Sequence, residues 1–151
     1  MTTVEKQQHI FGMIFLFANR IQTISDREGK DITLKQWFVL AVISKLEDQS
    51  PTINMVGDFM GYTRQNAKKI LTLLEQKGYV QLLVSPQDKR AKQVVLTKKA
   101  QAYFNETEAF GNQLIDDLFK GFDDKEVNRV FESFIKLEQN IQYLDEKNRK
   151  K

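Results

Sequence analysis

The sequence contains no cysteine and a single histidine, His9, among its 151 residues. Without cysteine the chain can form no disulfide, thiolate zinc site, iron–sulfur cluster or thiol-based redox sensor. One histidine leaves little for acid–base or transition-metal chemistry, and the chain shows neither a phosphate-binding glycine loop nor a nucleophile paired with a base. The sequence therefore predicts a protein that is not an enzyme and that uses no metal or other cofactor.

Long apolar runs and helix-breaking residues are also scarce. The longest apolar run, residues 10–18, is nine residues long, about half of what a bilayer span needs, and no basic leader with a cleavage site accompanies it. The two prolines and seven glycines of the chain favour long helices. We therefore expect a mainly helical, soluble, cytoplasmic protein that makes no contact with membranes.

Basic residues concentrate in the middle of the chain, although the net charge is only +3. Residues 33–99 carry eleven Lys or Arg against five Asp or Glu, whereas residues 100–151 carry eight against eleven. This asymmetry is typical of a nucleic-acid-binding module with helical support, and charged residues that only form solvated faces produce it too. Composition alone leaves both interpretations open.

The middle of the chain begins with two short helices. Thr33 and Gln36 form a capping box, in which each side chain bonds the backbone of the other residue, and this box predicts a helix that runs to about Leu46. Pro51 precedes a second short helix, expected at 53–60. A tight turn then leads to the next element.

A third helix and a β-hairpin complete this middle region. Thr63 is a plausible N-cap for a helix at 64–77. After this helix the pattern changes, because 79–84 and 93–96 are rich in β-forming residues and flank a polar loop at 85–92. We therefore predict a mainly α fold with a small β-hairpin.

The helix expected at 64–77 has one apolar and one cationic face. At about 100° per residue, Ala67 and Leu71 share the inward side while Gln65 and Lys69 lie opposite. Amide side chains can make the two-point contact that selects adenine in a major groove, and lysine can reach guanine or a phosphate. A short helix, a glycine-containing turn and such a helix form a helix-turn-helix, and the hairpin makes it a winged helix. A basic amphipathic surface helix would look the same on its own.

Helices with coiled-coil-like seams are expected at both ends of the chain. Apolar residues spaced four and three apart start at Ile10 and predict a first helix that ends before Gly29. Counted from the N-terminus, Thr97 caps the fifth helix of the chain, which runs to about residue 119, and Asp123 with Glu126 opens the sixth.

The two seams offer more apolar surface than the short middle helices of one chain can cover, which predicts a homodimer. Packing of the end helices against the winged helix of their own chain is the alternative. The residues expected to form the dimer are Ile10, Ile14, Phe17, Val127, Val130, Phe134, Leu137, Ile141 and Leu144. On this interpretation residues 1–32 and 98–151 are the dimerisation region and residues 33–97 the DNA-binding region of a single interwoven domain.

Several motifs resemble the MarR family of transcriptional regulators, and the resemblance extends over almost the whole chain. Residues 56–63 read VGDFMGYT before the third short helix, and residues 74–80 read LEQKGYV at its end. Residues 86–90, PQDKR, match the Asp-x-Arg wing of the family, and residues 95–97, VLT, match its Leu-Thr exit.

The resemblance implies a homodimer that binds a pseudo-palindromic duplex sequence-specifically and regulates transcription, and we expect repression. It implies that Arg90 enters the minor groove while Asp88 holds its guanidinium; a loose surface ion pair is the alternative. A small aromatic or amphipathic effector that releases the DNA is a candidate partner, for which we assign no residues. The residues predicted to contact DNA are Thr63, Arg64, Gln65, Asn66, Lys68, Lys69, Thr72, Asp88, Lys89, Arg90 and Lys92.

One departure from the family concerns packing. Gly57 occupies a helical position where the family usually has alanine, and a helical glycine costs about 1 kcal/mol unless close packing requires it. The main alternative function is a winged-helix dimer that binds proteins without specific DNA binding. Such a module would bind duplexes weakly and with no preference for sequence.

Overall fold

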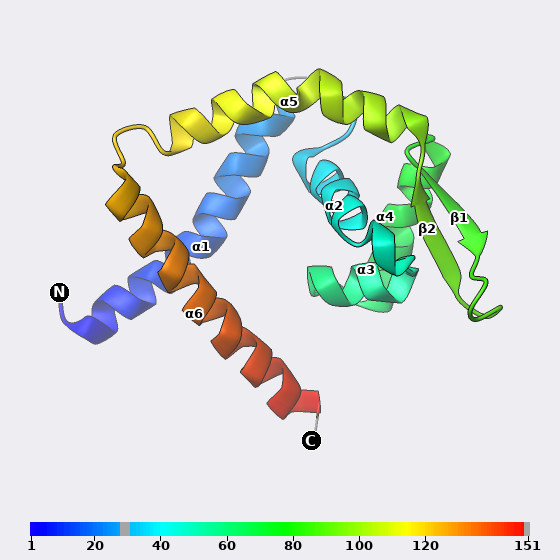
Figure 1. The fold of residues 1–151 in the computed structure, drawn as a ribbon. Helices are drawn as coiled ribbons and strands as arrows, with labels where there is room; N and C mark the ends of the chain where they lie inside the picture. The colour runs from blue at the N-terminus through cyan, green and yellow to red at the C-terminus, as the bar shows by residue number, and fades with distance from the viewer. Residues whose placement is uncertain (28–30, 150–151) are drawn as a thin grey trace. The chain divides into compact units, whose positions relative to one another are not determined.

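The computed structural model describes residues 1–27 and 31–149. Its contacts divide the chain into two compact units, Met1–Asn105 and Glu106–Lys151. The elements, labelled in Figure 1, are α1 (Thr3–Asp26), α2 (Leu34–Lys45), the 3₁₀ helix η1 (Glu47–Gln49), α3 (Ile53–Met60), α4 (Arg64–Gln76), β1 (Val80–Val84), β2 (Lys92–Leu96), α5 (Lys98–Leu118) and α6 (Asp124–Arg149). The mainly α fold with one hairpin confirms the predicted fold class.

The first helix is longer than its apolar pattern predicts. It begins at Thr3, seven residues before Ile10, because Thr2 and Glu5 form a capping box in which the Glu5 N–H donates to Thr2 Oγ1 at 3.2 Å. Apolar spacing marks only the stripe of a helix that can pack, whereas the cap sets where its backbone starts. The helix ends at Asp26, and Gly29 lies outside the described residues.

The predicted starts of α2 and α3 are confirmed by their caps. Thr33 Oγ1 accepts the N–H of Gln36 at 3.2 Å, and the Gln36 side chain accepts the N–H of Thr33 at 3.1 Å, which completes the predicted capping box. Thr52 Oγ1 accepts the N–H of Met55 at the start of α3. Threonine is effective here because its hydroxyl replaces a missing backbone acceptor in the first helical turn.

The two strands of the hairpin start one residue away from their predicted starts. Gly78 adopts φ +79° after α4, and the Tyr79 N–H donates to the carbonyl of Leu74 at 2.9 Å. Because Tyr79 still bonds to the helix end, β1 begins at Val80 rather than at residue 79. Lys92, predicted to lie in the loop, is the first residue of β2 and pairs with Val84 in the antiparallel ladder.

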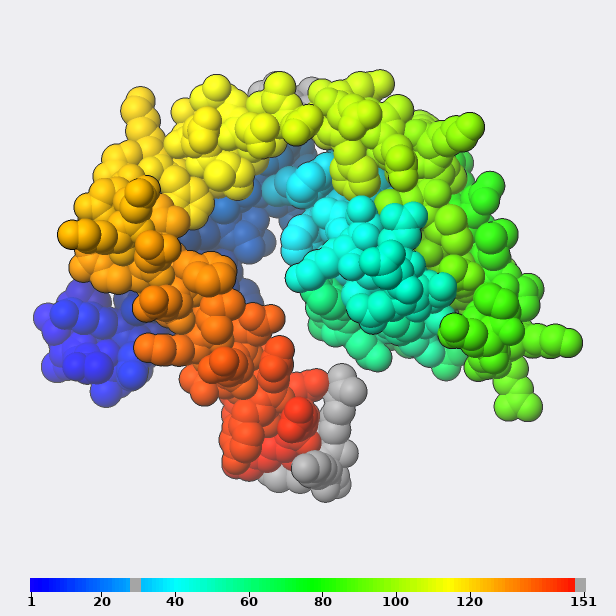
Figure 2. Space-filling model, in the orientation of Figure 1, coloured from blue at the N-terminus to red at the C-terminus, as the bar shows by residue number. Residues whose placement is uncertain are grey.

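The hydrophobic core of the first unit joins α2, α3, α4, the hairpin and the start of α5. Leu40 of α2 and Leu71 of α4 are fully buried, as are Tyr79 and Val94 at the hairpin. The Val94 N–H also donates to the carbonyl of Pro51 at 2.8 Å, which ties the chain before α3 to β2. This shared core holds α4 and the hairpin on one rigid base, from which the hairpin, green in Figure 2, projects.

The second unit consists of the later part of α5 and the whole of α6. Gly121 adopts φ +89° between them, and Asp123 and Glu126 form the predicted capping box of α6, with the Glu126 N–H donating to Asp123 Oδ1 at 2.8 Å. Every side chain described from residue 124 to residue 148 is exposed. Among the described helices, none is long and apolar enough to cross a membrane.

Candidate nucleic-acid interface

Helix α4 turns its apolar side chains into the core and its polar ones to solvent. Ala67, Leu71 and Leu74 are fully buried, whereas Arg64 and Gln65 on the first turn are exposed. Thr63 caps the helix, its Oγ1 accepting the N–H of Asn66 at 3.2 Å. The two-faced helix expected at 64–77 is therefore confirmed, and its exposed face has no acidic residue before Glu75.

Ten of the eleven side chains predicted to contact DNA are exposed. The exception is Thr72, which is half-buried. The exposed ones lie at the start and on the outer face of α4 and on the hairpin. Their contact with DNA itself stays a prediction.

Glu75, the acidic residue of α4, accepts a hydrogen bond from the hairpin. Glu75 Oε1 accepts the backbone N–H of Leu82 in β1 at 2.9 Å. Because β1 pairs with β2 on its other side only, this bond satisfies a donor on the open edge of the sheet. It joins α4 to the hairpin and keeps a negative charge away from the cationic first half of the helix.

The tip of the hairpin is ordered by two side chains that bond backbone N–H groups. Ser85 is buried, and its Oγ accepts from the N–H groups of Gln87 and Asp88 at 3.3 and 3.4 Å. Asp88 Oδ1 accepts the backbone N–H of Arg90 at 2.9 Å. These bonds fold the tip so that Lys89 and Arg90 are exposed.

In the isolated chain Asp88 bonds a different part of Arg90 from the guanidinium that it is expected to hold on DNA. Asp88 and Arg90 are both described by the structure and form no ion pair with each other, so the Asp88 carboxylate does not hold the Arg90 guanidinium in the free chain. It bonds the Arg90 backbone instead, because a carboxylate two residues earlier reaches that N–H in an Asx turn. The Arg90 side chain is thus left available for another partner.

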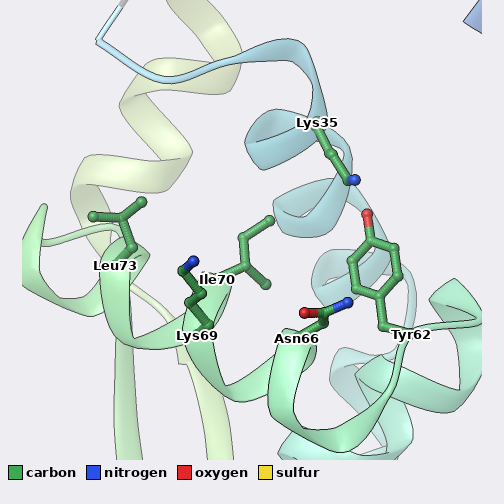
Figure 3. A pocket seen from close by; sticks show the side chains of 6 residues that line it. All are labelled: Lys35, Tyr62, Asn66, Lys69, Ile70 and Leu73. Atoms are coloured by element: carbon green, nitrogen blue, oxygen red, sulfur yellow. The ribbon is translucent and has the colours of Figure 1, made fainter. Parts of the chain in front are cut away.

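A shallow hollow lies between α2, the turn before α4 and α4 itself (Figure 3). It has a volume of about 280 Å³ and is lined by Lys35, Tyr62, Asn66, Lys69, Ile70 and Leu73. The Lys35 ammonium lies 5.2 Å from the centre of the Tyr62 ring. Sequence reasoning missed Lys35 and Tyr62, because nothing in the sequence spacing indicates that the first turn of α2 lies beside α4.

Asp31 holds the end of α4 and the start of α5 to the segment before α2. Its Oδ2 accepts the Tyr79 hydroxyl at 2.6 Å and the Lys99 ammonium at 3.3 Å, and Lys77 donates to its backbone carbonyl. The hydrogen bond from Tyr79 and the bond and charge of Lys99 lower the pKa of Asp31 below 3.8. This cluster, which sequence reasoning also missed, stabilises the base of the hairpin.

The residues predicted to form a dimer lie on α1 and α6. All nine are exposed in the single chain, from Leu137 at 36% to Ile141 at 63%. Large apolar side chains in such rows are usually covered by a partner. Among the residues described, no group of three or more His, Cys, Asp or Glu could hold a metal ion.

The middle of the chain is similar to a known protein family. Residues 30–91, which span α2 to the tip of the hairpin, match the model of the MarR family. The match covers 62 of the 151 residues, and over this region the chain is similar to the MarR family. The match covers the helix-turn-helix, β1 and the tip of the hairpin, and with them every motif recognised in the sequence except the one at residues 95–97.

Solved structures of MarR proteins share the fold over nearly the full chain. A MarR/EmrR family transcriptional regulator from Acinetobacter sp. ADP1 has a TM-score of 0.79 at 20% identity, covering 91% of this chain and 97% of that one. MepR of S. aureus, in a complex with DNA, has a TM-score of 0.77 at 20% identity over 89% and 97%. A MarR variant from E. coli, with operator DNA, has a TM-score of 0.76 at 21% identity over 91% and 99%.

Proposed function

We propose that this protein is a MarR-family transcriptional regulator that binds duplex DNA sequence-specifically. The observation that carries the proposal is the exposed first half of α4, which presents Arg64, Gln65, Lys68 and Lys69 without an acidic neighbour. Its fold is shared with proteins solved on DNA and on operator DNA.

In this proposal α4 enters the major groove and the hairpin reaches the adjacent minor groove. Gln65 is placed to read adenine through its amide, and Thr63 and Arg64 lie where the unpaired N–H groups of the helix start attract phosphate. Arg90, unpaired with Asp88 in the free chain, is available for a narrow minor groove, where the negative potential is strongest.

The functional unit is a homodimer. The exposed apolar rows on α1 and α6 support residues 1–32 and 98–151 as the dimerisation region, with residues 33–97 reading DNA. A two-fold dimer matches two half-sites about one helical turn apart on a pseudo-palindromic operator. We further propose that binding represses transcription and that a small aromatic or amphipathic effector releases the DNA.

Selection from a randomised duplex library at two salt concentrations tests the proposal. We expect enrichment of a palindromic sequence and an affinity that falls steeply with salt, because every phosphate that the protein neutralises releases counterions. Binding that enriches no palindrome would refute sequence-specific regulation and favour a winged-helix module that binds proteins.

Two substitutions separate the roles within the interface. Gln65→Ala should lose discrimination worth about 1–3 kcal/mol at one base position, because it removes a two-point contact. Arg90→Ala should weaken binding and relax the preference for narrow minor grooves. Both side chains are exposed, so neither change should disturb folding. Equal losses on every sequence from both variants would contradict the assignment.

A further inference from the structure

The hollow beside α4 carries two lysines from different helices. Lys35 comes from the first turn of α2 and Lys69 from the middle of α4, and Asn66 lies between them on the same wall. Figure 3 shows the Lys35 side chain reaching down toward Tyr62 at the upper edge of the hollow. No acidic residue lines it. The hollow therefore offers an anion two lysine ammonium groups and one side-chain amide.

We propose that Lys35 contacts a backbone phosphate of the bound duplex and that this hollow receives the sugar–phosphate strand. The proposal rests on the proposed DNA binding and adds to it a residue of α2 outside the predicted interface. Lysine acts on phosphate as a mobile point charge, so it needs proximity rather than an exact angle.

The exposed surface of α4 has two flanks that support this division. Asn66, Lys69 and Leu73 lie on the flank that lines the hollow. Gln65 and Lys68 are centred about 100° around the helix axis from that group at 3.6 residues per turn, with Lys69, about 40° from Gln65, nearest to the boundary between the flanks. When a helix lies in the major groove, one flank faces a strand backbone and the base edges lie deeper in the groove. The hollow side is then the backbone side, and base reading falls to the Gln65 flank.

The lining of the hollow suits a sugar–phosphate strand better than a base edge. Ile70 and Leu73 form its apolar part, and Leu73 is 40% exposed. These side chains offer no hydrogen bond to a base, but they can pack against deoxyribose while the lysines meet the phosphate. The aromatic ring of Tyr62, 5.2 Å from the Lys35 ammonium, keeps that charge at the edge of the hollow through a cation–π interaction.

Lys35→Gln tests the proposal on the full-length protein, with the selected operator duplex as the probe. Affinity should fall uniformly across operator variants. Because a homodimer carries two copies of Lys35, the slope of log affinity against log salt should become less steep by about 1.8, or about 0.9 for each protomer. Between 50 and 200 mM salt the wild-type dimer should thus lose roughly twelvefold more affinity than the variant does. The profile of preferred bases should not change.

Lys45→Gln is the matched control. Lys45 lies on the same helix, about 15 Å along its axis from Lys35, and it makes the same kind of contact, 5.3 Å from the ring of Phe59. It does not line the hollow. Its substitution removes the same charge and should leave the salt slope close to that of the wild type.

The outcomes separate this proposal from DNA binding itself. If the wild type enriches no operator, the proposed function fails. If the wild type binds with a steep salt slope but Lys35→Gln keeps that slope, or changes it no more than Lys45→Gln does, the phosphate contact is refuted. Tyr62→Phe should keep the affinity and Tyr62→Leu should lower it, because only phenylalanine retains the ring; equal behaviour of these two variants would refute the role of the ring.

Discussion

Replacing Gly57 with alanine should destabilise the helix-turn-helix, although alanine is the better helix former. A Cβ at residue 57 of α3 would lie 3.0 Å from the Cβ of Ala67 in α4, and 3.7 Å from the carbonyl oxygen of Tyr62. The first contact is shorter than ordinary van der Waals contacts of 3.4–4 Å. Ala67 is fully buried, so it cannot move into solvent, and α3 and α4 must separate.

The expected size of the effect is the difference between two opposing terms. Forcing one extra carbon into a packed core costs about 1–3 kcal/mol. Replacing a helical glycine by alanine returns about 1 kcal/mol. We therefore expect Gly57→Ala to lower the free energy of unfolding by about 1 kcal/mol. The close contact with Ala67 also explains why a glycine stands in helix α3 at residue 57, since it is the close packing that a helical glycine requires.

A double-mutant cycle isolates the contact. Ala67→Gly removes the opposing Cβ and should itself destabilise α4, but Gly57→Ala should then become stabilising by about 1 kcal/mol. The coupling between the two positions should be about 2 kcal/mol. Urea denaturation followed by circular dichroism at one fixed protein concentration measures it, since the stability of a dimer depends on concentration. Effects that add within about 0.5 kcal/mol would refute the packing argument.

Three further predictions concern a charge, the core and the dimer. The lowered pKa of Asp31 means that its carboxylate stabilises the fold above pH 3.8, and that this contribution disappears as the pH falls through the lower pKa of the folded state. Asp31→Asn should cost up to about 1 kcal/mol at pH 7, since the ion pair with Lys99 is half exposed. Urea titrations at falling pH should show the difference in free energy of unfolding between variant and wild type becoming smaller. Leu40→Ala, at a fully buried position, should cost about 2–5 kcal/mol in the same assay, and a loss below about 1 kcal/mol would contradict its place in the core. Phe134→Asp on α6 should shift the protein from dimer to monomer in analytical ultracentrifugation, while Gln139→Asp, also exposed on α6, should remain dimeric; identical sedimentation of the two variants would argue against this face.

Local signals predicted the helix boundaries best where a side chain caps the backbone. The capping box of Thr33 and Gln36 and that of Asp123 and Glu126 are both formed, because a cap depends on residues three apart in sequence. The start of α1 was wrong because apolar spacing was followed instead of the cap at Thr2. The predicted start of β1 was one residue too early because Tyr79 remains bonded to α4, and that of β2 was one residue too late because Lys92 already pairs with Val84.

The candidate site was predictable where it lies on one helix. Counting at 3.6 residues per turn separates buried Leu71 from exposed Gln65, and both sides are confirmed. Thr72 was placed outside by the same counting, but it is half-buried in the folded chain. Periodicity describes an isolated helix and cannot report which neighbour lies against its flank.

The sequence by itself determined the elements, the caps and the two-faced α4, because each depends on residues a few positions apart. Its lack of cysteine likewise excludes thiol chemistry without any coordinates. Only the tertiary structure decided which distant residues meet: Lys35 with Tyr62, and Glu75 with the edge of β1. It also decided that Asp88 bonds the backbone of Arg90 rather than its guanidinium. These contacts depend on how the core orients α2, α4 and the hairpin, and that orientation arises from packing between segments far apart in the chain.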